Sequence, residues 1–326
     1  MMRWATFLGL AGLLLAIGLF VGQGVAEVAA AFLAGGIGLI WASLFHIVPM
    51  AVNARAWHVL LPPRRRPGLA FFLWLVWVRE AVNGLLPVAR IGGEVVSARL
   101  MRLGGLPTSQ AVASLVVDVT LSLASQFLFT IIGIGLLLAL SGDIDLGLRL
   151  TLALLLTVPF VIVLIAVQRR GLFELMGRLF NMLFRERWST LIGATARIDR
   201  AVRHLYRRRA WLMRCLAWQL LGWILGAGEI WLALRYLGHP VGVAEAIVLE
   251  ALAQAVSSAA FMVPAALGVQ EGGFLVFGGI LGLGPEIGLA LALARRLRDI
   301  VVFVPALLAW QYVEGKRWWL SDGVRR

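Results

Sequence analysis

Long apolar runs recur along the whole chain, and they restrict its fold more than any other feature. Runs of about 20 residues or more cover, for example, positions 4–22, 109–140 and 211–237. A helix of about 20 residues crosses about 30 Å of hydrocarbon. Only 14% of the 326 residues are charged, against about 25% in soluble domains. The alternating segments typical of a transmembrane β-barrel do not occur. The sequence therefore predicts an all-α, polytopic helical membrane protein whose single integral membrane domain covers residues 1–326.

The apolar segments also predict the order of the helices. The first run follows Arg3 and resembles a signal peptide, but it is long for one and Val25-Ala-Glu27 is a poor cleavage context, so we expect an uncleaved helix. Prolines and arginines at 62–67 mark a surface loop. The expected helical segments are 4–22, 28–52, 69–86, 95–103, 109–140, 146–167, 211–237, 243–262 and 286–313.

The net charge of +13 comes almost entirely from arginine, because Lys316 is the only lysine. The arginines gather in the 62–67 loop, between 169 and 214, and in the C-terminal tail. This pattern is typical of cytoplasmic loops beside anionic headgroups and not of nucleic-acid binding. It predicts that both termini are cytoplasmic and that the acidic loop at 141–145 is outside. We expect the protein to lie in the bacterial inner (cytoplasmic) membrane. The stretch 168–210 is expected to form a basic amphipathic helix on the membrane surface.

The stretch 83–94 interrupts an apolar region with groups that a lipid-exposed helix carries only at high cost. Each unsatisfied polar group in hydrocarbon costs several kcal/mol, so such backbone is expected to line a protected cavity. The charge pattern requires 69–107 to begin and end on the cytoplasmic side, and its second segment reaches only about 14 Å. We therefore predict a re-entrant pair of half-helices here. The polar and helix-breaking residues of the stretch are Asn83, Pro87, Arg90, Gly92, Gly93 and Glu94.

A second stretch repeats this pattern with the opposite orientation. Pro87 and Glu94 are seven residues apart, as are Pro264 and Glu271, and glycines flank both glutamates. By the same charge argument, 243–284 begins and ends outside. The sequence predicts an inverted repeat of about 28–140 and 211–313, with broken helices that meet near the midplane, an architecture typical of transporters. The whole chain would make about six full crossings plus two re-entrant broken-helix hairpins. The expected backbone breaks are Pro87, Gly92, Gly93, Pro264 and Gly268.

Ionisable residues within apolar segments are the candidate functional residues. Arginines suit the phosphate of a lipid headgroup, and helix N-termini after the two prolines would face it. The alternative is that these charges pair with one another and hold the hairpins together. We expect Glu94 and Glu271 to approach one polar cavity near the midplane. The residues predicted for substrate binding or coupling are Arg79, Glu80, Asn83, Arg90, Glu94, Asp118, Gln254, Glu271, Arg296 and Asp299; Glu229, Glu250, Arg295 and Arg298 are further intramembrane charges.

Motifs for catalysis, metals and cofactors do not occur in the sequence. G-x-S-x-G, H-E-x-x-H and P-loop patterns are missing. Cys215 is the only cysteine, which excludes an intrachain disulfide and a cysteine metal site. We therefore expect no metal and no cofactor, and the leading interpretation is not an enzyme. The histidines are scattered without metal-ligand spacing at His46, His58, His204 and His239.

Two motifs resemble the signatures of the flippase-like transmembrane family, the membrane domain of lysylphosphatidylglycerol synthases. They are Asn83-Gly-Leu-Leu-Pro87-x-x-Arg90-x-Gly-Gly-Glu94 and Pro264-x-x-x-Gly268-Val-Gln-Glu271. The resemblance covers nearly the whole chain, and stretches such as 90–99 and 295–299 are most similar to its hopanoid-associated HpnL branch. The family usually shows Pro-Gly-Gly-x-Gly-x-x-Glu, whereas this chain has Ala265 and Ala266 after the proline.

This resemblance implies that the protein handles lipids. Aminoacyl transfer needs a separate soluble synthase domain, which we do not expect because the sequence stops soon after Val313. The expected function is a translocase or transport factor for hopanoids or a related polar lipid, whose headgroup enters a midplane polar cavity. Two alternatives stay open. One is a membrane enzyme that modifies a lipid headgroup with Glu94 or Asp118 as general base; the other is a non-catalytic scaffold for lipid-biosynthesis enzymes.

Overall fold

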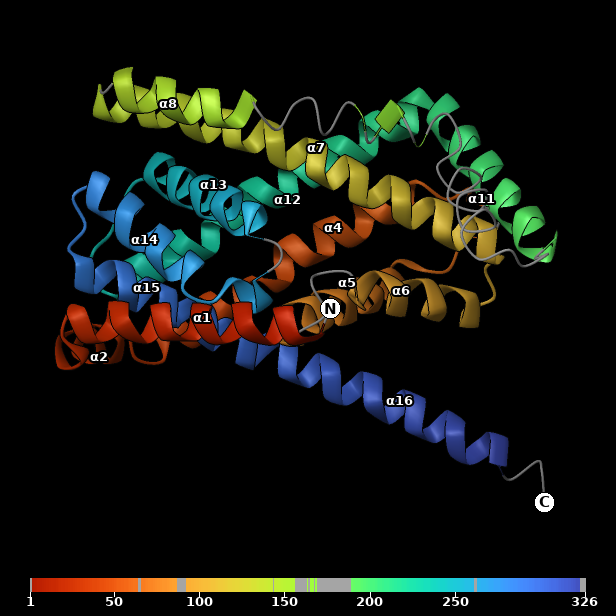
Figure 1. Cartoon of the computed structure of the whole chain (residues 1–326), viewed down its shortest axis with the longest axis horizontal. Coiled ribbons are helices and arrows are strands. Elements are labelled where there is room, and N and C mark those ends of the chain that lie inside the picture. Colours follow the sequence, from red (N-terminus) through yellow and green to blue (C-terminus); the bar gives the residue numbers. More distant parts are fainter. Residues whose placement is uncertain are drawn as a thin grey trace. The chain divides into compact units, whose positions relative to one another are not determined.

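The computed structural model describes residues 2–63, 66–86, 92–142, 144–155, 163, 165–166, 168, 189–260 and 263–322. Over these ranges every regular element is a helix, as the apolar runs predicted (Figure 1). The elements are α1 (Met2–Gly22), α2 (Val25–Ala34), α3 (Gly38–Phe45), α4 (Ile47–Val59), α5 (Leu69–Leu85), α6 (Gly92–Leu103), α7 (Thr108–Ser141), α8 (Ile144–Leu155), α11 (Ser189–Arg207), α12 (Arg209–Tyr236), α13 (Val243–Ala259), η1 (Pro264–Ala266), α14 (Val269–Ile280), α15 (Pro285–Arg298), η2 (Asp299–Phe303) and α16 (Val304–Asp322).

The single helix predicted at 28–52 is wrong. The chain there forms the three helices α2, α3 and α4. A separate bend of 90° lies just before this run, between the segments Leu13–Gly22 and Val25–Ala34. The break after α2 contains Gly36, whose φ of 49° lies in the left-handed region that favours glycine. Hydropathy alone hides this break, because glycine interrupts a helix without making the run polar. The backbone at the break forms turn hydrogen bonds, such as that from the N–H of Gly36 to the carbonyl oxygen of Leu33, and both α2 and α3 pack against α15.

Three described segments are long and apolar enough to cross a membrane. They are Gly38–Val59, Thr108–Ser141 and Arg209–Tyr236, and the bent pair in α1 and α2 adds a fourth if it forms one span. This agrees with a membrane protein. The total of about six crossings and the inverted repeat stay predictions.

Helices start and stop near both predicted hairpin motifs. α5 ends at Leu85 and α6 begins at Gly92, while Pro87 and Arg90 lie outside the described residues. Gly92 and Gly93 form the first turn of α6. In the second motif the helical turn η1 separates α13 from α14. Three positions there have positive φ: 53° at Ala265, 48° at Ala266 and 75° at Gly268.

The chain divides into two compact units. Unit 1 contains Met1–Met50, Val76–Val95 and Leu225–Arg326, and unit 2 contains Ala51–Leu75 and Val96–Ile224. In unit 1, α14 packs against α13 and α15. In unit 2, α7 packs against α8 and α11.

The described part of the basic stretch is the helix α11. Val202 and Leu205 are buried on one side of it, and the helix packs against α7. Arg197, Arg200 and Arg207 are exposed on the other side. The buried apolar residues of α11 therefore lie in a helix that packs on protein, and a position of the stretch 168–210 on the membrane surface stays a prediction. The apolar residues at 172–184 that suggested a surface helix lie outside the described residues.

Candidate functional site

Charged side chains from six helices and one connecting turn meet within unit 1. His46 lies at the turn between α3 and α4, and the other residues come from α5, α12, α13, α14, α15 and η2. Five of them are at most 7% exposed: Glu229, Glu250, Glu271, Arg295 and Asp299. We call the following nine residues the ionic cluster: His46, Glu80, Glu229, Glu250, Glu271, Arg295, Arg296, Arg298 and Asp299.

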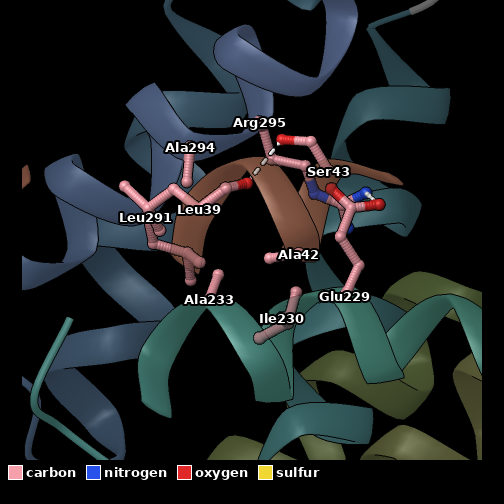
Figure 2. Close-up of a pocket in the computed structure, with 9 residues that line it drawn as sticks. All are labelled: Leu39, Ala42, Ser43, Glu229, Ile230, Ala233, Leu291, Ala294 and Arg295. Carbon is pink, nitrogen blue, oxygen red and sulfur yellow. Dashed lines mark hydrogen bonds and ion pairs between the residues drawn. The ribbon is translucent and has the colours of Figure 1, made fainter. Parts of the chain in front are cut away.

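Glu229 is the residue on which most of these contacts converge. Its Oε2 lies 2.9 Å from Nδ1 of His46 and accepts hydrogen bonds from Nη1 of Arg295 at 3.3 Å and Nη1 of Arg298 at 3.4 Å. An ionised carboxylate this deeply buried is stable only when cations and donors surround it. Figure 2 shows Glu229 and Arg295 directed toward each other from α12 and α15.

The arginines of α15 extend this network to both sides. Arg295 also pairs with Glu250, whose Oε1 accepts a hydrogen bond from Nε2 of Gln254 at 3.1 Å. Arg298 donates from Nη2 and Nε to Oδ1 of Asp299 at 2.6 and 3.1 Å. Each of these guanidinium groups therefore already faces carboxylates.

Arg296 ties α15 to the second helix break. Its Nε and Nη2 donate to Oε1 of Glu271 at 3.0 and 2.7 Å, and its Nη1 donates to the carbonyl oxygen of Ala265 at 3.0 Å. Nη1 also lies 3.6 Å from Oδ2 of Asp299. The other oxygen of Glu271, Oε2, is buried and has no hydrogen-bond partner among the described residues.

The α15–α16 junction helps to position these side chains. The chain forms a π-helical turn at η2, from Asp299 to Phe303, between two α-helices. Such turns are rare and occur often at functional sites. Here Nε1 of Trp77 donates to the carbonyl oxygen of Val302 at 2.7 Å.

His46 was missed by the sequence reasoning, which tested histidines only for metal spacing. Its Nε2 lies 3.1 Å from Oε2 of Glu80, on the opposite side of the ring from Glu229. The ring also meets that of Phe303 edge-on at 5.7 Å. The sequence did contain a signal that could have identified His46, because an ionisable ring within an apolar segment is by itself a candidate functional residue.

The first helix break holds its glutamate through a neutral side chain. Nδ2 of Asn83 donates to both carboxylate oxygens of Glu94 at 3.1 Å, and Oδ1 of Asn83 accepts from the backbone N–H of Gly93 at 2.9 Å. Gly93 lies directly against the carbonyl oxygen of Arg79, so no larger residue fits there. The amide thus links the end of α5 to the start of α6.

The structure brings together only part of the predicted site. Glu80, Glu271, Arg296 and Asp299 belong to the ionic cluster, and Gln254 joins it through Glu250. Asn83 and Glu94 form their own pair in the same unit. Asp118 lies in unit 2, where it is buried and accepts a hydrogen bond from Gln219 at 2.9 Å. A common cavity for Glu94 and Glu271 stays a prediction.

A small cavity adjoins the ionic cluster (Figure 2). Its volume of about 10 Å³ is on the order of one water molecule, so no lipid headgroup fits in it. Ser43, Glu229 and Arg295 form its polar end. Its apolar wall is formed by Leu39, Ala42, Ile230, Ala233, Leu291 and Ala294.

Within the ranges that the structure describes, no three or more His, Cys, Asp and Glu side chains are grouped so as to hold a metal ion. The ionic cluster itself consists of carboxylates, guanidinium groups and one imidazole, which can exchange ion pairs and protons.

Comparison with known proteins agrees with a membrane location. No curated protein and no solved structure matches the chain. The model of one family, described as the lysylphosphatidylglycerol synthase TM region, matches residues 6–307. That family indicates a function related to membrane lipids. Because the match extends over nearly the whole sequence, the chain belongs to the family of the lysylphosphatidylglycerol synthase transmembrane region.

Proposed function

We propose that this protein moves a lipid across or within the membrane and that the ionic cluster handles the polar headgroup. The family supports a role in membrane-lipid chemistry. The observation that carries the proposal is the cluster itself, which gathers nine titratable side chains in the interior of unit 1. Such groups within apolar helices mark substrate or ion pathways by default.

Stability alone does not account for so many buried charges. Replacing a buried ion pair by well-packed apolar residues is often neutral or stabilising by about 1–4 kcal/mol. A chain under no functional demand would therefore do as well with leucine and phenylalanine at these positions. The buried cluster therefore fits a site whose ion pairs open and re-form.

The arginines supply the groups that an anionic headgroup needs. Guanidinium binds phosphate through two parallel hydrogen bonds, as it binds carboxylate. In the structure Arg295, Arg296 and Arg298 are all paired with carboxylates. A phosphate that binds one of these arginines must therefore displace its carboxylate. Because the adjoining cavity has room for about one water molecule, the helices must also separate. Headgroup entry and rupture of ion pairs then occur as one event, which is the behaviour required of an alternating-access carrier.

The finer parts of the proposal rest on the sequence motifs. The resemblance of 90–99 and 295–299 to the hopanoid-associated branch favours a hopanoid or a related polar lipid as the cargo. The arginine distribution favours cytoplasmic termini, and we propose a bacterial inner membrane as the location. We include Arg79, Asn83, Arg90, Glu94 and Gln254 in the proposed pathway, together with an inverted repeat of two broken helices.

Lipid movement in vesicles tests the proposal. The purified protein is placed in phosphatidylcholine vesicles with a trace of fluorescent phosphatidylglycerol or of a fluorescent hopanoid, and a membrane-impermeant quencher reports which leaflet holds the probe. We expect the wild type to make the inner-leaflet probe accessible and Glu271→Gln, Arg296→Lys and Glu94→Gln to slow this strongly. Movement at the wild-type rate in all three variants would rule out this site.

A matched control and a chemical measurement separate the alternatives. Glu27→Gln makes the same change at an exposed carboxylate in α2 and should move the probe like the wild type. Size-exclusion chromatography checks that each variant is folded. Mass spectrometry of the recovered probe distinguishes transport from headgroup modification, because an enzyme would change the mass of the lipid. Movement of both probes at equal rates would argue against selectivity for hopanoids.

A further inference from the structure

We propose that His46 is a proton-binding site that couples proton movement to the lipid movement inferred above. The proton occupancy follows from the geometry around the ring and stands apart from the lipid. The coupling deepens the proposed function and rests on it.

Both nitrogens of the His46 ring face carboxylate oxygens. Nδ1 lies 2.9 Å from Oε2 of Glu229 and Nε2 lies 3.1 Å from Oε2 of Glu80. A neutral imidazole has one N–H donor and one lone pair, whereas the imidazolium ion donates from both nitrogens. A carboxylate is only an acceptor when it is ionised, so a lone pair on either nitrogen would face another lone pair. Two simultaneous contacts of this length therefore require one extra proton, and we place it on His46.

The charges around the ring favour this proton. From α5 the ring faces Glu80 and from α12 it faces Glu229; Arg298 of α15 opposes the proton, and the Phe303 ring covers another side. With all carboxylates ionised, the acidic residues outnumber the guanidinium groups. The acidic residues of the cluster are Glu80, Glu229, Glu250, Glu271 and Asp299, and its guanidinium groups are Arg295, Arg296 and Arg298. The imidazolium ion restores one of the two missing positive charges.

Glu80 offers the route by which this proton leaves. The side chain of Glu80 is 24% exposed, against 5% for Glu229. Transfer breaks the Nε2–H bond of His46 and forms an O–H bond on Oε2 of Glu80, which yields a neutral imidazole and a carboxylic acid. The acid then releases its proton to water on its more exposed side. Reloading reverses these steps.

Loss of the proton changes how the helices are tied together. The imidazolium ion links the α3–α4 turn to α5 through Glu80 and to α12 through Glu229. After the proton leaves, only one of the two contacts keeps a donor, and the other becomes a repulsion between lone pairs. The link between His46 and α5 is then lost. This couples the protonation state to the contacts that must open for a headgroup.

Nitrogen NMR of the histidine rings tests the proton occupancy directly. In protein labelled with ¹⁵N-histidine, the His46→Gln variant identifies the His46 signals among those of the four histidines. At pH 7 we expect both ring nitrogens of His46 to have shifts of protonated nitrogen. In Glu80→Gln we expect a neutral ring, because the amide of glutamine can donate to the lone pair. Glu94→Gln is the matched control and should leave the signals unchanged, since Glu94 binds Asn83.

The same vesicles test the coupling. With a pH difference across the membrane, we expect the rate of probe movement to change by up to about tenfold per pH unit, the equivalent of about 1.36 kcal/mol, and Glu80→Gln to lose this dependence. A neutral His46 ring in the wild type at pH 7 would overturn the proton site. Movement that ignores the pH difference would overturn the coupling and leave the lipid function standing. No movement under any condition would overturn both the coupling and the lipid function, while an imidazolium signal would still establish the proton site.

Discussion

The two broken helices of unit 1 place a glutamate at the same position but hold it by different means. Glu94 is the third residue of α6 and Glu271 is the third residue of α14, so both carboxylates lie in the first turn, where the helix dipole favours negative charge. Glu94 binds Asn83, which belongs to the helix just before the break. Glu271 binds Arg296, which belongs to the following helix α15.

This difference shows which break depends on charge. The Asn83 amide is neutral and both donates and accepts hydrogen bonds. If it is removed, the carboxylate of Glu94 is only partly buried and can form hydrogen bonds with other groups. A guanidinium group that neutralises a buried carboxylate cannot be lost so easily, because breaking a buried pair strands a charge. We therefore expect the second break to be rigid only while Arg296 is in place, and the first to tolerate more change.

The largest expected effect is that of Arg296→Ala. The substitution leaves Glu271 buried without its cation and frees the carbonyl oxygen of Ala265, so we expect the free energy of unfolding to fall by about 3–5 kcal/mol. Titration of the protein in mixed micelles with a denaturing detergent measures this change. In a Glu271→Gln background the same substitution should cost less than about half as much, since no charge is stranded. Equal losses in both backgrounds would show that the pair is not coupled.

Gly93→Ala is expected to have the next largest effect. A Cβ at Gly93 would collide with the carbonyl oxygen of Arg79 and the side chain of Asn83, and backbone cannot move aside easily. We expect a loss of about 2–3 kcal/mol, as in other overpacked sites. Gly272→Ala is the matched control in α14, where a Cβ meets only Leu19 at an ordinary distance of 3.9 Å. That change should be neutral or stabilise by up to about 1 kcal/mol, and the same unfolding titration compares the two.

Asn83→Ala should lower the free energy of unfolding less than Arg296→Ala or Gly93→Ala does. It removes two hydrogen bonds to Glu94 and one from Gly93, and we expect a loss of about 1–2 kcal/mol from groups left without partners. Hydrogen exchange of the Gly93 amide gives a local readout, because its acceptor is gone. A loss as large as that of Arg296→Ala would erase the proposed difference between the two breaks.

The smallest expected effect is an increase in stability, in the variant Ala265→Gly. Ala265 has φ of 53° and Ala266 has φ of 48°, in a region where non-glycine residues are strained by about 1–2 kcal/mol. The family usually has glycines after this proline, so we expect Ala265→Gly to stabilise by about 0.5–1 kcal/mol after the added chain entropy is subtracted. Ala253→Gly within α13 is the opposite control and should destabilise by about 1 kcal/mol. A loss of stability in Ala265→Gly would contradict the strained conformation.

Hydropathy was sufficient to locate the helices that continue without a break through one apolar run. The run at 109–140 became α7, Thr108–Ser141, and the run at 211–237 became α12, Arg209–Tyr236. The run at 28–52 was misread, since Gly35 and Gly36 are as compatible with an apolar pattern as alanine is. Nothing local marks that α2 and α3 each have a partner surface on α15, and without that surface the break would be unfavourable.

For the candidate site, the sequence could predict which charged residues are candidates, but not which side chains they contact. Charges in apolar segments need partners, so the sequence alone marked Glu80, Glu271, Arg296 and Asp299 as candidates, and the structure places them in one ionic cluster. The membrane location and the lipid-related family were also determined there, because hydrophobic length and motif spacing are local properties of a chain. Tertiary structure decided that Asp118 pairs with Gln219 in unit 2 and that His46 joins Glu80 to Glu229. Those contacts join residues up to 183 positions apart, and such pairings depend on how helices pack, which no local pattern specifies.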